Sequence, residues 1–337
     1  MKRVVYGVLG ILLAAAAAVA LAYLAVFAPT ERFNPPRQVS IQKGESLAGA
    51  ARELERAGVI RNEIAFVIYA EMSGKARQVK PGDYAFVGGE NTPEVLEHLV
   101  RGDFMVITVT IPEGMTLHQI GQRLEENGLL CDYAFDHAAM LGKIPRELGL
   151  GSLGAEGFLF PATYRFGPHV TADEAVAAML ARFYEILTPA VEERLFELGL
   201  TARQMVTMAS IVEKEAKVPG ERPLIAGVFY NRLRLGMPLQ SDPTAQYNAS
   251  GEVEHAVAAV RMPSAYNTYS IVGLPPGPIA NPGLSSIMAA LYPDHTDYLY
   301  FVARSDGTHI FSKSFEEHER AIAELRRTAD RAGPPHG

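Results

Sequence analysis

The chain has 337 residues, a net charge of −7 and charged side chains at 20% of its positions. A chain of this length buries a sizeable core and is expected to form more than one domain. The acidic balance lacks the basic surface that nucleic-acid-binding proteins present, so no nucleic-acid partner is expected. Because Cys131 is the only cysteine, an intrachain disulfide, a zinc site with several cysteine ligands and a CxxC redox centre are excluded.

Residues 4–28 form an uncharged segment that follows the basic start of the chain. A membrane-spanning helix needs about 20 apolar residues, so this segment is long enough to be a single transmembrane anchor. Basic flanks stay in the cytoplasm, which predicts that residues 1–3 are cytoplasmic. The rest of the chain would then lie outside the inner (cytoplasmic) membrane, in the periplasm or on the outer face. A cleaved signal peptide is the alternative, although its apolar region is usually only about 7–15 residues long.

An internal repeat lies beyond a predicted proline-containing linker, residues 29–38. The segment 39–47 recurs as 109–117, an offset of 70 residues, and each copy predicts a short strand, a glycine turn and a helix. The region 39–150, which holds both copies, resembles LysM-type peptidoglycan-binding modules. A packing or spacer domain is the alternative. The expected helix N-caps are Ser46 and Thr116, and the expected helix ends are Gly58 and Gly128.

A glycine-rich stretch at 149–154 marks the expected start of a second domain of mixed α+β structure, residues 151–331, which is followed by a short tail, 332–337. Apolar periodicity predicts helices in this domain. Asp306-Gly307 between two apolar runs predicts a β-hairpin. The expected elements are helices at 172–187, 189–198 and 223–235, hairpin strands at 298–303 and 308–311, and a last helix from 315 to about 330.

The helix that begins after Thr201 is the most informative for chemistry. Residues 201–204 form a capping box, and an apolar stripe runs from Met205 to Ala216. Glu213 lies at the edge of this stripe, about 60° from its centre, whereas Glu215 is expected to face solvent. Partial burial raises the pKa of a carboxyl group, as a general acid near neutral pH requires. The alternative is a helix-edge glutamate paired with Lys217.

Three polar loops follow this helix, at 239–244, 265–269 and 273–283, and the first and the last of them contain proline. Proline fixes φ, so such loops are rigid, and their tyrosines and amides suit a sugar chain. A turn-rich connection with core tyrosines is the alternative. The sequence has no HExxH, no GxSxG and no P-loop, so no metal and no cofactor are expected.

Several segments of this region resemble the YceG-like endolytic murein transglycosylases, in the order found in that family. They are 156–164, 206–215, 231–244, 265–269 and 273–277. Ala162 departs from the family pattern, since many relatives have an acidic residue there. The departure concerns a polar contact at position 162 and not the catalytic chemistry.

The resemblance implies a lytic transglycosylase, an α+β lyase with Glu213 as its catalytic residue. Such enzymes cleave the β-1,4 bond between N-acetylmuramic acid and N-acetylglucosamine without adding water. Glu213 would protonate the leaving oxygen and then accept the proton of the C6 hydroxyl, which closes a 1,6-anhydro end. The residues that the resemblance assigns to substrate binding are Gln240, Asp242, Tyr266, Asn267, Tyr269 and Glu156.

The resulting interpretation is a single-pass membrane enzyme that cuts nascent glycan strands and so terminates their elongation. By analogy with the family, peptidoglycan synthases (penicillin-binding proteins) are its expected partners. Two alternatives stay open. One is a hydrolase (muramidase) in which Asp242 or Glu156 is a second carboxylate that positions water. The other is a non-catalytic peptidoglycan-binding scaffold.

Overall fold

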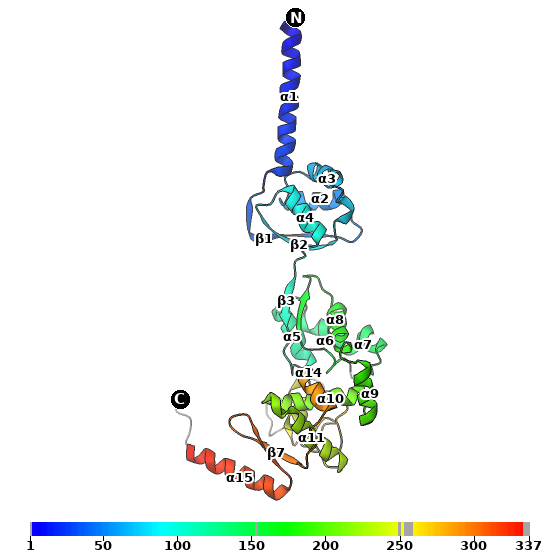
Figure 1. Ribbon diagram of the computed structural model, residues 1–337, viewed down its shortest axis with the longest axis vertical. Helices are drawn as coiled ribbons and strands as arrows, with labels where there is room; N and C mark the ends of the chain where they lie inside the picture. The colour runs from blue at the N-terminus through cyan, green and yellow to red at the C-terminus, as the bar shows by residue number, and fades with distance from the viewer. Residues whose placement is uncertain (1, 152–153, 249–250, 253–258, 333–337) are drawn as a thin grey trace. The chain divides into compact units, whose positions relative to one another are not determined.

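A computed structural model describes residues 2–151, 154–248, 251–252 and 259–332 (Figure 1). It contains both helices and strands, with runs of consecutive helices between short antiparallel strand pairs, in agreement with the predicted mixed α+β class. The chain divides into a first unit, residues 1–107, and a second unit, residues 108–337. This boundary lies before the second repeat copy, whereas the sequence analysis placed it at 149–154.

The chain begins with helix α1 (Lys2–Phe27). Its segment Leu9–Phe27 has a mean hydropathy of 2.5 and is long and apolar enough to cross a membrane. The predicted single apolar helix near the N-terminus is therefore confirmed.

The remainder of the first unit packs three helices against a two-stranded antiparallel sheet. The strands are β1 (Arg32–Ile41) and β2 (Gly82–Gly88). The expected linker 29–38 is thus largely strand, with its pairing interrupted between Arg32 and Arg37. Pro35 and Pro36 lie in this interruption and have no N–H to donate to the ladder. The helices are α2 (Leu47–Arg56), α3 (Glu63–Met72) and α4 (Thr92–Arg101), with a 3-10 turn at Ala76–Gln78.

The two repeat copies have the same local structure. Ser46 Oγ accepts a hydrogen bond from the backbone N–H of Gly49, and Thr116 Oγ1 accepts one from Gln119. The equivalent glycines after the two helices have φ values of 69°. The strand of the first copy pairs with β2, whereas β3 (Ile107–Thr110) of the second pairs with β4 (Thr163–Phe166). This pairing explains why the second copy belongs to the second unit.

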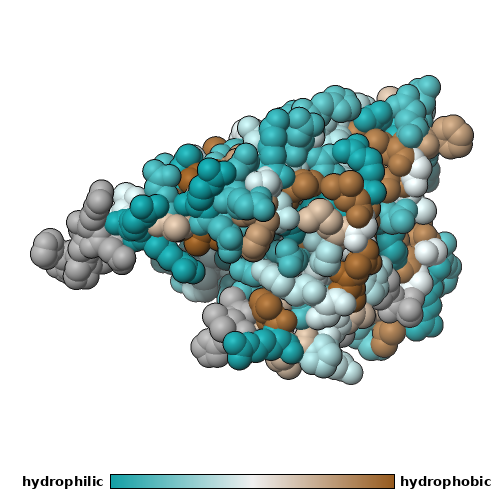
Figure 2. Space-filling view, turned by 90° about the horizontal axis from the view of Figure 1, so that it is seen from below, coloured by the Kyte–Doolittle hydropathy of each residue, from teal (hydrophilic) through white to brown (hydrophobic). Residues whose placement is uncertain are grey.

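The centre of the second unit is helix α10 (Ala202–Glu215), in which every residue from Met205 to Val212 is buried. Helices α11 (Arg222–Arg234) and α14 (Leu284–Leu291) pack on it. The outer surface seen in Figure 2 is mainly hydrophilic, with hydrophobic residues in small groups. The other helices are α5 (Leu117–Glu126), α6 (Asp132–Leu141), α7 (Lys143–Glu147), α8 (Ala172–Tyr184), α9 (Pro189–Leu198) and α12 (Asp242–Gln246), with a 3-10 turn at Pro219–Glu221.

The predicted hairpin and last helix are confirmed as β7 (Tyr300–Ala303), β8 (His309–Ser312) and α15 (Phe315–Ala332). Two shorter strands, β5 (Tyr247–Asn248) and β6 (Gly251–Glu252), also pair with each other. The predicted helices at 172–187, 189–198 and 223–235 correspond to α8, α9 and α11 with ends within three residues.

Candidate active site

Glu213, in the last turn of α10, belongs to a buried ion pair. Its Oε1 lies 3.1 Å from Arg222 Nη2, and its Oε2 accepts hydrogen bonds from Ser286 Oγ (2.7 Å) and the N–H of Gly283 (3.1 Å). Arg222 Nε also donates to Ser286 Oγ, at 2.9 Å. The Glu213 side chain is only 7% exposed. Both carboxylate oxygens therefore have protein donors, and the charged partner is Arg222 instead of Lys217.

Glu113 is a second carboxylate near Glu213 that the sequence analysis did not single out. Partial burial raises its pKa, the charge of Glu213 raises it further, and the charge of Arg222 lowers it. Glu113 precedes Gly114 in the glycine turn of the second repeat copy. The N–H of Gly114 donates to the carbonyl of Asn281, and the N–H of Asn281 donates to that of Met115. These bonds hold the turn beside the loop that contacts Glu213.

Glu215, the last residue of α10, lies on another side of the helix. Ser241 Oγ donates a hydrogen bond of 2.6 Å to its Oε1. The pKa of Glu215 is raised to about 7, mainly by burial and to a smaller extent by the charge of Asp242. The hydrogen bond from Ser241 acts in the opposite direction. The expectation that Glu215 faces solvent is wrong, because the loop that carries Ser241 covers it. A helical wheel gives the direction of a side chain but not what packs there.

Glu215 lines a cavity of ≈ 400 Å³ together with three of the predicted binding residues, Gln240, Asp242 and Tyr269. The Tyr269 hydroxyl donates a hydrogen bond of 2.6 Å to Asp242 Oδ1. The opposite wall comes from the C-terminal hairpin and α15, which the sequence analysis did not connect with the site. The aromatic residues of these two elements were the sequence signal that could have linked them to the site, since sugars pack on flat rings. The aromatic residues on this wall are Tyr300, Phe301, His309, Phe315 and His318.

Arg232 lines this cavity and bonds to the loop that carries Gln240. Its Nη1 donates to the carbonyls of Pro238 (3.1 Å) and Leu239 (3.0 Å) and to Gln240 Oε1 (3.1 Å). Its Nε donates to the carbonyl of Leu299 at 2.6 Å. The buried guanidinium thus connects α11 to the Gln240 loop and to the start of the hairpin.

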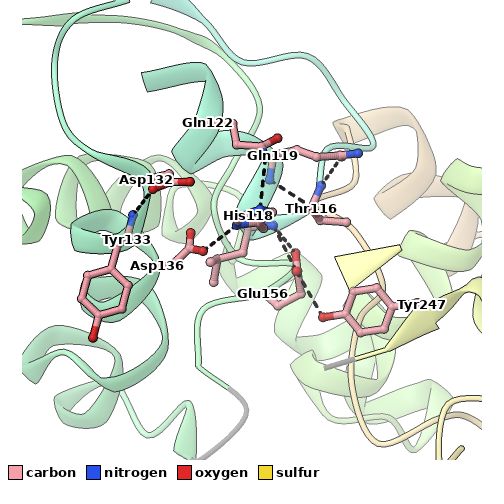
Figure 3. Close-up of polar contacts among 10 residues, drawn as sticks. Thr116, His118, Gln119, Gln122, Asp132, Tyr133, Asp136, Glu156 and Tyr247 are labelled. Atoms are coloured by element: carbon pink, nitrogen blue, oxygen red, sulfur yellow. Dashed lines mark hydrogen bonds and ion pairs between the residues drawn. The ribbon is translucent and has the colours of Figure 1, made fainter. Parts of the chain in front are cut away.

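Glu156 lies in a different place, below the first turn of α5 (Figure 3). Its carboxylate accepts hydrogen bonds from the N–H of Leu117 (3.0 and 3.1 Å), from Asn281 Nδ2 (2.9 Å) and from Tyr247 (3.2 Å). Burial raises its pKa to about 7, although these hydrogen bonds oppose the shift. Glu156 is 6% exposed and does not line the cavity described above. It connects the second repeat copy to the loop at Asn281.

Tyr266 and Asn267 also lie outside the lining of the cavity. The buried Asn267 side chain donates to the carbonyls of Val260 and Met262, both at 2.9 Å, and accepts from the N–H of Tyr269 at 3.0 Å. The Tyr266 ring packs on that of Tyr247, with centroids 4.9 Å apart. Asn267 therefore shapes the loop that carries Tyr269 and has no free amide to offer a ligand.

A model of the YceG-like family matches residues 39–324. The endolytic murein transglycosylase of Bacillus subtilis (strain 168) is 33% identical over 305 residues, which cover 84% of this chain and 83% of that protein. The endolytic murein transglycosylase of Streptococcus pneumoniae (strain D39) is 31% identical over 320 residues, 85% of this chain and 58% of that protein.

A solved structure is similar as well. The crystal structure of a YceG-like protein from Listeria monocytogenes matches with a TM-score of 0.59 and 32% sequence identity. The match covers 87% of this chain and 99% of that chain.

Proposed function

Because the chain belongs to the YceG-like family, whose model spans residues 39–324, we propose that it is an endolytic murein transglycosylase with Glu215 as its catalytic residue. Its substrate is peptidoglycan, as the name of its relatives implies. The single observation that supports Glu215 is its position in a cavity beside Gln240, Asp242 and Tyr269. We assign the catalytic role to Glu215 and not to Glu213, because the Glu213 carboxylate is bonded to Arg222, Ser286 and Gly283.

A carboxyl group with a pKa near 7 suits both steps of the reaction. As an acid, Glu215 donates its proton to the glycosidic oxygen while the bond from that oxygen to C1 of the muramyl ring breaks. The ring then carries oxocarbenium character. As a base, the resulting carboxylate accepts the proton of the C6 hydroxyl, whose oxygen bonds to C1 and forms the 1,6-anhydro end. The carboxyl group is protonated again at the end, and no water is consumed.

The remaining cavity residues have supporting roles in this proposal. Ser241 holds the Glu215 carboxylate in one orientation, and burial together with the charge of Asp242 raises its pKa. The aromatic wall from the hairpin and α15 provides flat surfaces against which sugar rings pack. Glu213 and Glu156 act as positioning residues, since they join α10 and α5 to the loops around the site.

The experiment that tests this assignment compares Glu215→Gln with Glu213→Gln in the full chain, purified in detergent and incubated with murein glycan strands. General acid–base catalysis contributes about 10²–10⁴-fold, so Glu215→Gln is expected to lose cleavage by that factor. Mass spectrometry of wild-type products is expected to show internal fragments with anhydro ends, one water lighter than hydrolysis products. Full activity in Glu215→Gln, with a loss confined to a folded Glu213→Gln, would assign the chemistry to Glu213.

The same products separate the two alternative functions. Hydrated ends would identify a hydrolase, for which Asp242 is the second carboxylate nearest to Glu215 in the cavity. Strands that bind but stay intact would identify a non-catalytic scaffold.

We also propose where the protein is located and which proteins it meets. Helix α1 is an anchor in the inner membrane, with residues 1–3 in the cytoplasm and the catalytic unit on the outer face or in the periplasm. Cleavage close to the membrane would terminate nascent strands, which makes peptidoglycan synthases the expected partners. Of the LysM-like repeat, the first copy is the better candidate for glycan binding, because the glycine turn of the second is already bonded to Asn281.

A further inference from the structure

The backbone of Gln240 has an unusual conformation. Its φ of 52° is in the left-handed region, and it is the only non-glycine with a positive φ among the residues that the structure describes. An L-residue is strained there, because its Cβ approaches the backbone, whereas glycine is not. Strained residues of this kind concentrate at ligand sites, where the side chain has a function that glycine cannot provide. Gln240 also lies at the cavity of Glu215.

The orientation of the Gln240 amide is fixed by its neighbour. Arg232 Nη1 lies 3.1 Å from Gln240 Oε1. A guanidinium group only donates hydrogen bonds, so the atom that faces it must be the amide oxygen. The amide nitrogen is then turned away from Arg232, and it has no acceptor among the described residues of the chain. Two N–H donors are therefore available to a ligand in the cavity.

The charges around the cavity restrict what those donors can bind. Glu215 and Asp242 line the same cavity, so a carboxylate on the ligand would be repelled there. A neutral carbonyl oxygen is the acceptor that suits an amide donor in this setting. In murein, both sugars carry such a group, the acetamido carbonyl at C2.

We propose that Gln240 is a specificity-determining residue that donates a hydrogen bond to the acetamido carbonyl of an N-acetylated sugar. This inference rests on the proposed function, because it takes the cavity of Glu215 as the glycan site. Arg232 has a positioning role, since it selects which end of the amide meets the ligand. The aromatic wall recognises any sugar ring, so the discrimination between acetylated and deacetylated sugars comes from Gln240.

The Gln240 side chain can be removed without leaving its neighbour Arg232 unbonded. Arg232 keeps its hydrogen bonds to the carbonyls of Pro238, Leu239 and Leu299 when the amide is removed. Gln240→Gly therefore leaves no unpaired buried charge, and it relieves the backbone. Gln240→Glu is the complementary variant, because its carboxylate still accepts from Arg232 but offers no donor. The two variants share only the loss of the amide N–H groups.

The test measures binding by calorimetry in the full-length Glu215→Gln variant, which prevents cleavage. The ligands are a chitin hexasaccharide, fully N-acetylated, and the deacetylated hexasaccharide. A neutral hydrogen bond contributes enough that we expect Gln240→Gly and Gln240→Glu each to weaken binding of the acetylated ligand about 3- to 10-fold. Binding of the deacetylated ligand is expected to change less than twofold in Gln240→Gly. The melting temperature of each variant checks that it is folded.

Other outcomes overturn the inference. An equal loss for both ligands in Gln240→Gly would mean that Gln240 only contributes packing, and no loss would remove it from recognition. A loss seen only with peptide-bearing murein strands would assign the donor to a carbonyl of the stem. If Glu215→Gln binds neither ligand, the cavity is not a glycan site, and the inference falls together with the assignment of Glu215. If binding behaves as expected while Glu215→Gln still cleaves murein, only the catalytic assignment fails.

Discussion

Glu213 and Glu215 are two residues apart on the last turn of α10, yet their carboxylates have separate sets of partners. Glu213 Oε1 lies 3.1 Å from Arg222, whereas Glu215 Oε1 accepts a hydrogen bond of 2.6 Å from Ser241. Two residues correspond to about 200° of rotation around a helix, which directs the side chains to opposite sides. One carboxylate is locked in an ion pair and the other lines a cavity. Because of this separation, substitutions of the two residues are expected to have different effects, on stability for Glu213 and on cleavage for Glu215.

Glu213→Gln is expected to lower the free energy of unfolding by about 3 kcal/mol, because it leaves the buried guanidinium of Arg222 without a charged partner. Urea denaturation measures the loss. Glu197→Gln is a matched control, since the Glu197 carboxylate pairs with Arg194 on the surface at 54% exposure. Exposed pairs of this kind contribute less than about 1 kcal/mol. Equal losses in the two variants would contradict the structural role of Glu213.

The pH dependence of cleavage is expected to follow Glu215. The acid must be protonated, so kcat/KM should fall as the pH rises through about 7. The charge of Asp242 raises the pKa of Glu215, so Asp242→Asn should move this descending limb to lower pH. The hydrogen bond from Ser241 lowers the pKa, so Ser241→Ala should move it to higher pH. Shifts in the same direction, or a limb that neither variant moves, would exclude Glu215 as the titrating group.

Glu156 is expected to make the stability of the protein depend on pH. Its folded pKa of about 7 exceeds the ordinary value of 4.5, so the native state binds this proton more tightly than the unfolded chain does. The associated stability is complete below pH 4.5 and is lost as the pH rises through 7. The loss approaches about 3 kcal/mol, since each tenfold change in proton affinity corresponds to about 1.4 kcal/mol.

Glu156→Gln tests this dependence, because it removes the titration while it keeps the shape of the side chain. Unfolding free energies measured from pH 4 to pH 8 should decline less in the variant than in the wild-type protein. Glu174→Gln is the control, since Glu174 is exposed and its pKa is lowered by Thr171, so its contribution to the slope has the opposite sign. An unchanged slope in Glu156→Gln would contradict the assignment.

The strain at Gln240 predicts an order of stability between two truncations. Gln240→Gly and Gln240→Ala both remove the amide, but only alanine keeps a Cβ in the left-handed conformation. Gln240→Gly should therefore be the more stable variant by about 1 kcal/mol, against the usual preference for alanine. Thermal denaturation compares the two. A more stable Gln240→Ala would show that the backbone at this position is not strained.

The orientation of the chain across the membrane can be read from its one cysteine. Cys131 is exposed and free. A membrane-impermeant maleimide added to intact cells with a permeable or absent outer membrane should label it, and Cys131→Ser should abolish the labelling. Labelling only after lysis would place the catalytic unit in the cytoplasm, contrary to the proposed location.

Much of the local structure was predictable because it depends on residues that are close in sequence. The capping box at Thr201, the Asp306-Gly307 hairpin and the apolar helix α1 are all present as the sequence indicates. The two predicted N-caps are present for the same reason, since Ser46 and Thr116 each accept a hydrogen bond from a backbone N–H three residues further along the chain. Family motifs likewise identified the family, because they are contiguous stretches of sequence.

Only the tertiary structure decided which of these pieces meet. Periodicity locates Glu213 at the edge of an apolar stripe, and the family resemblance implied its catalytic role. Neither states what covers the other faces of α10. Ser241, 26 residues away, covers Glu215, and the C-terminal hairpin closes the cavity beside it. The second repeat copy belongs to the second unit because β3 pairs with β4. A carboxyl group acquires its pKa and its role from such distant neighbours, since burial and charge are properties of the folded environment and not of the spacing along the chain.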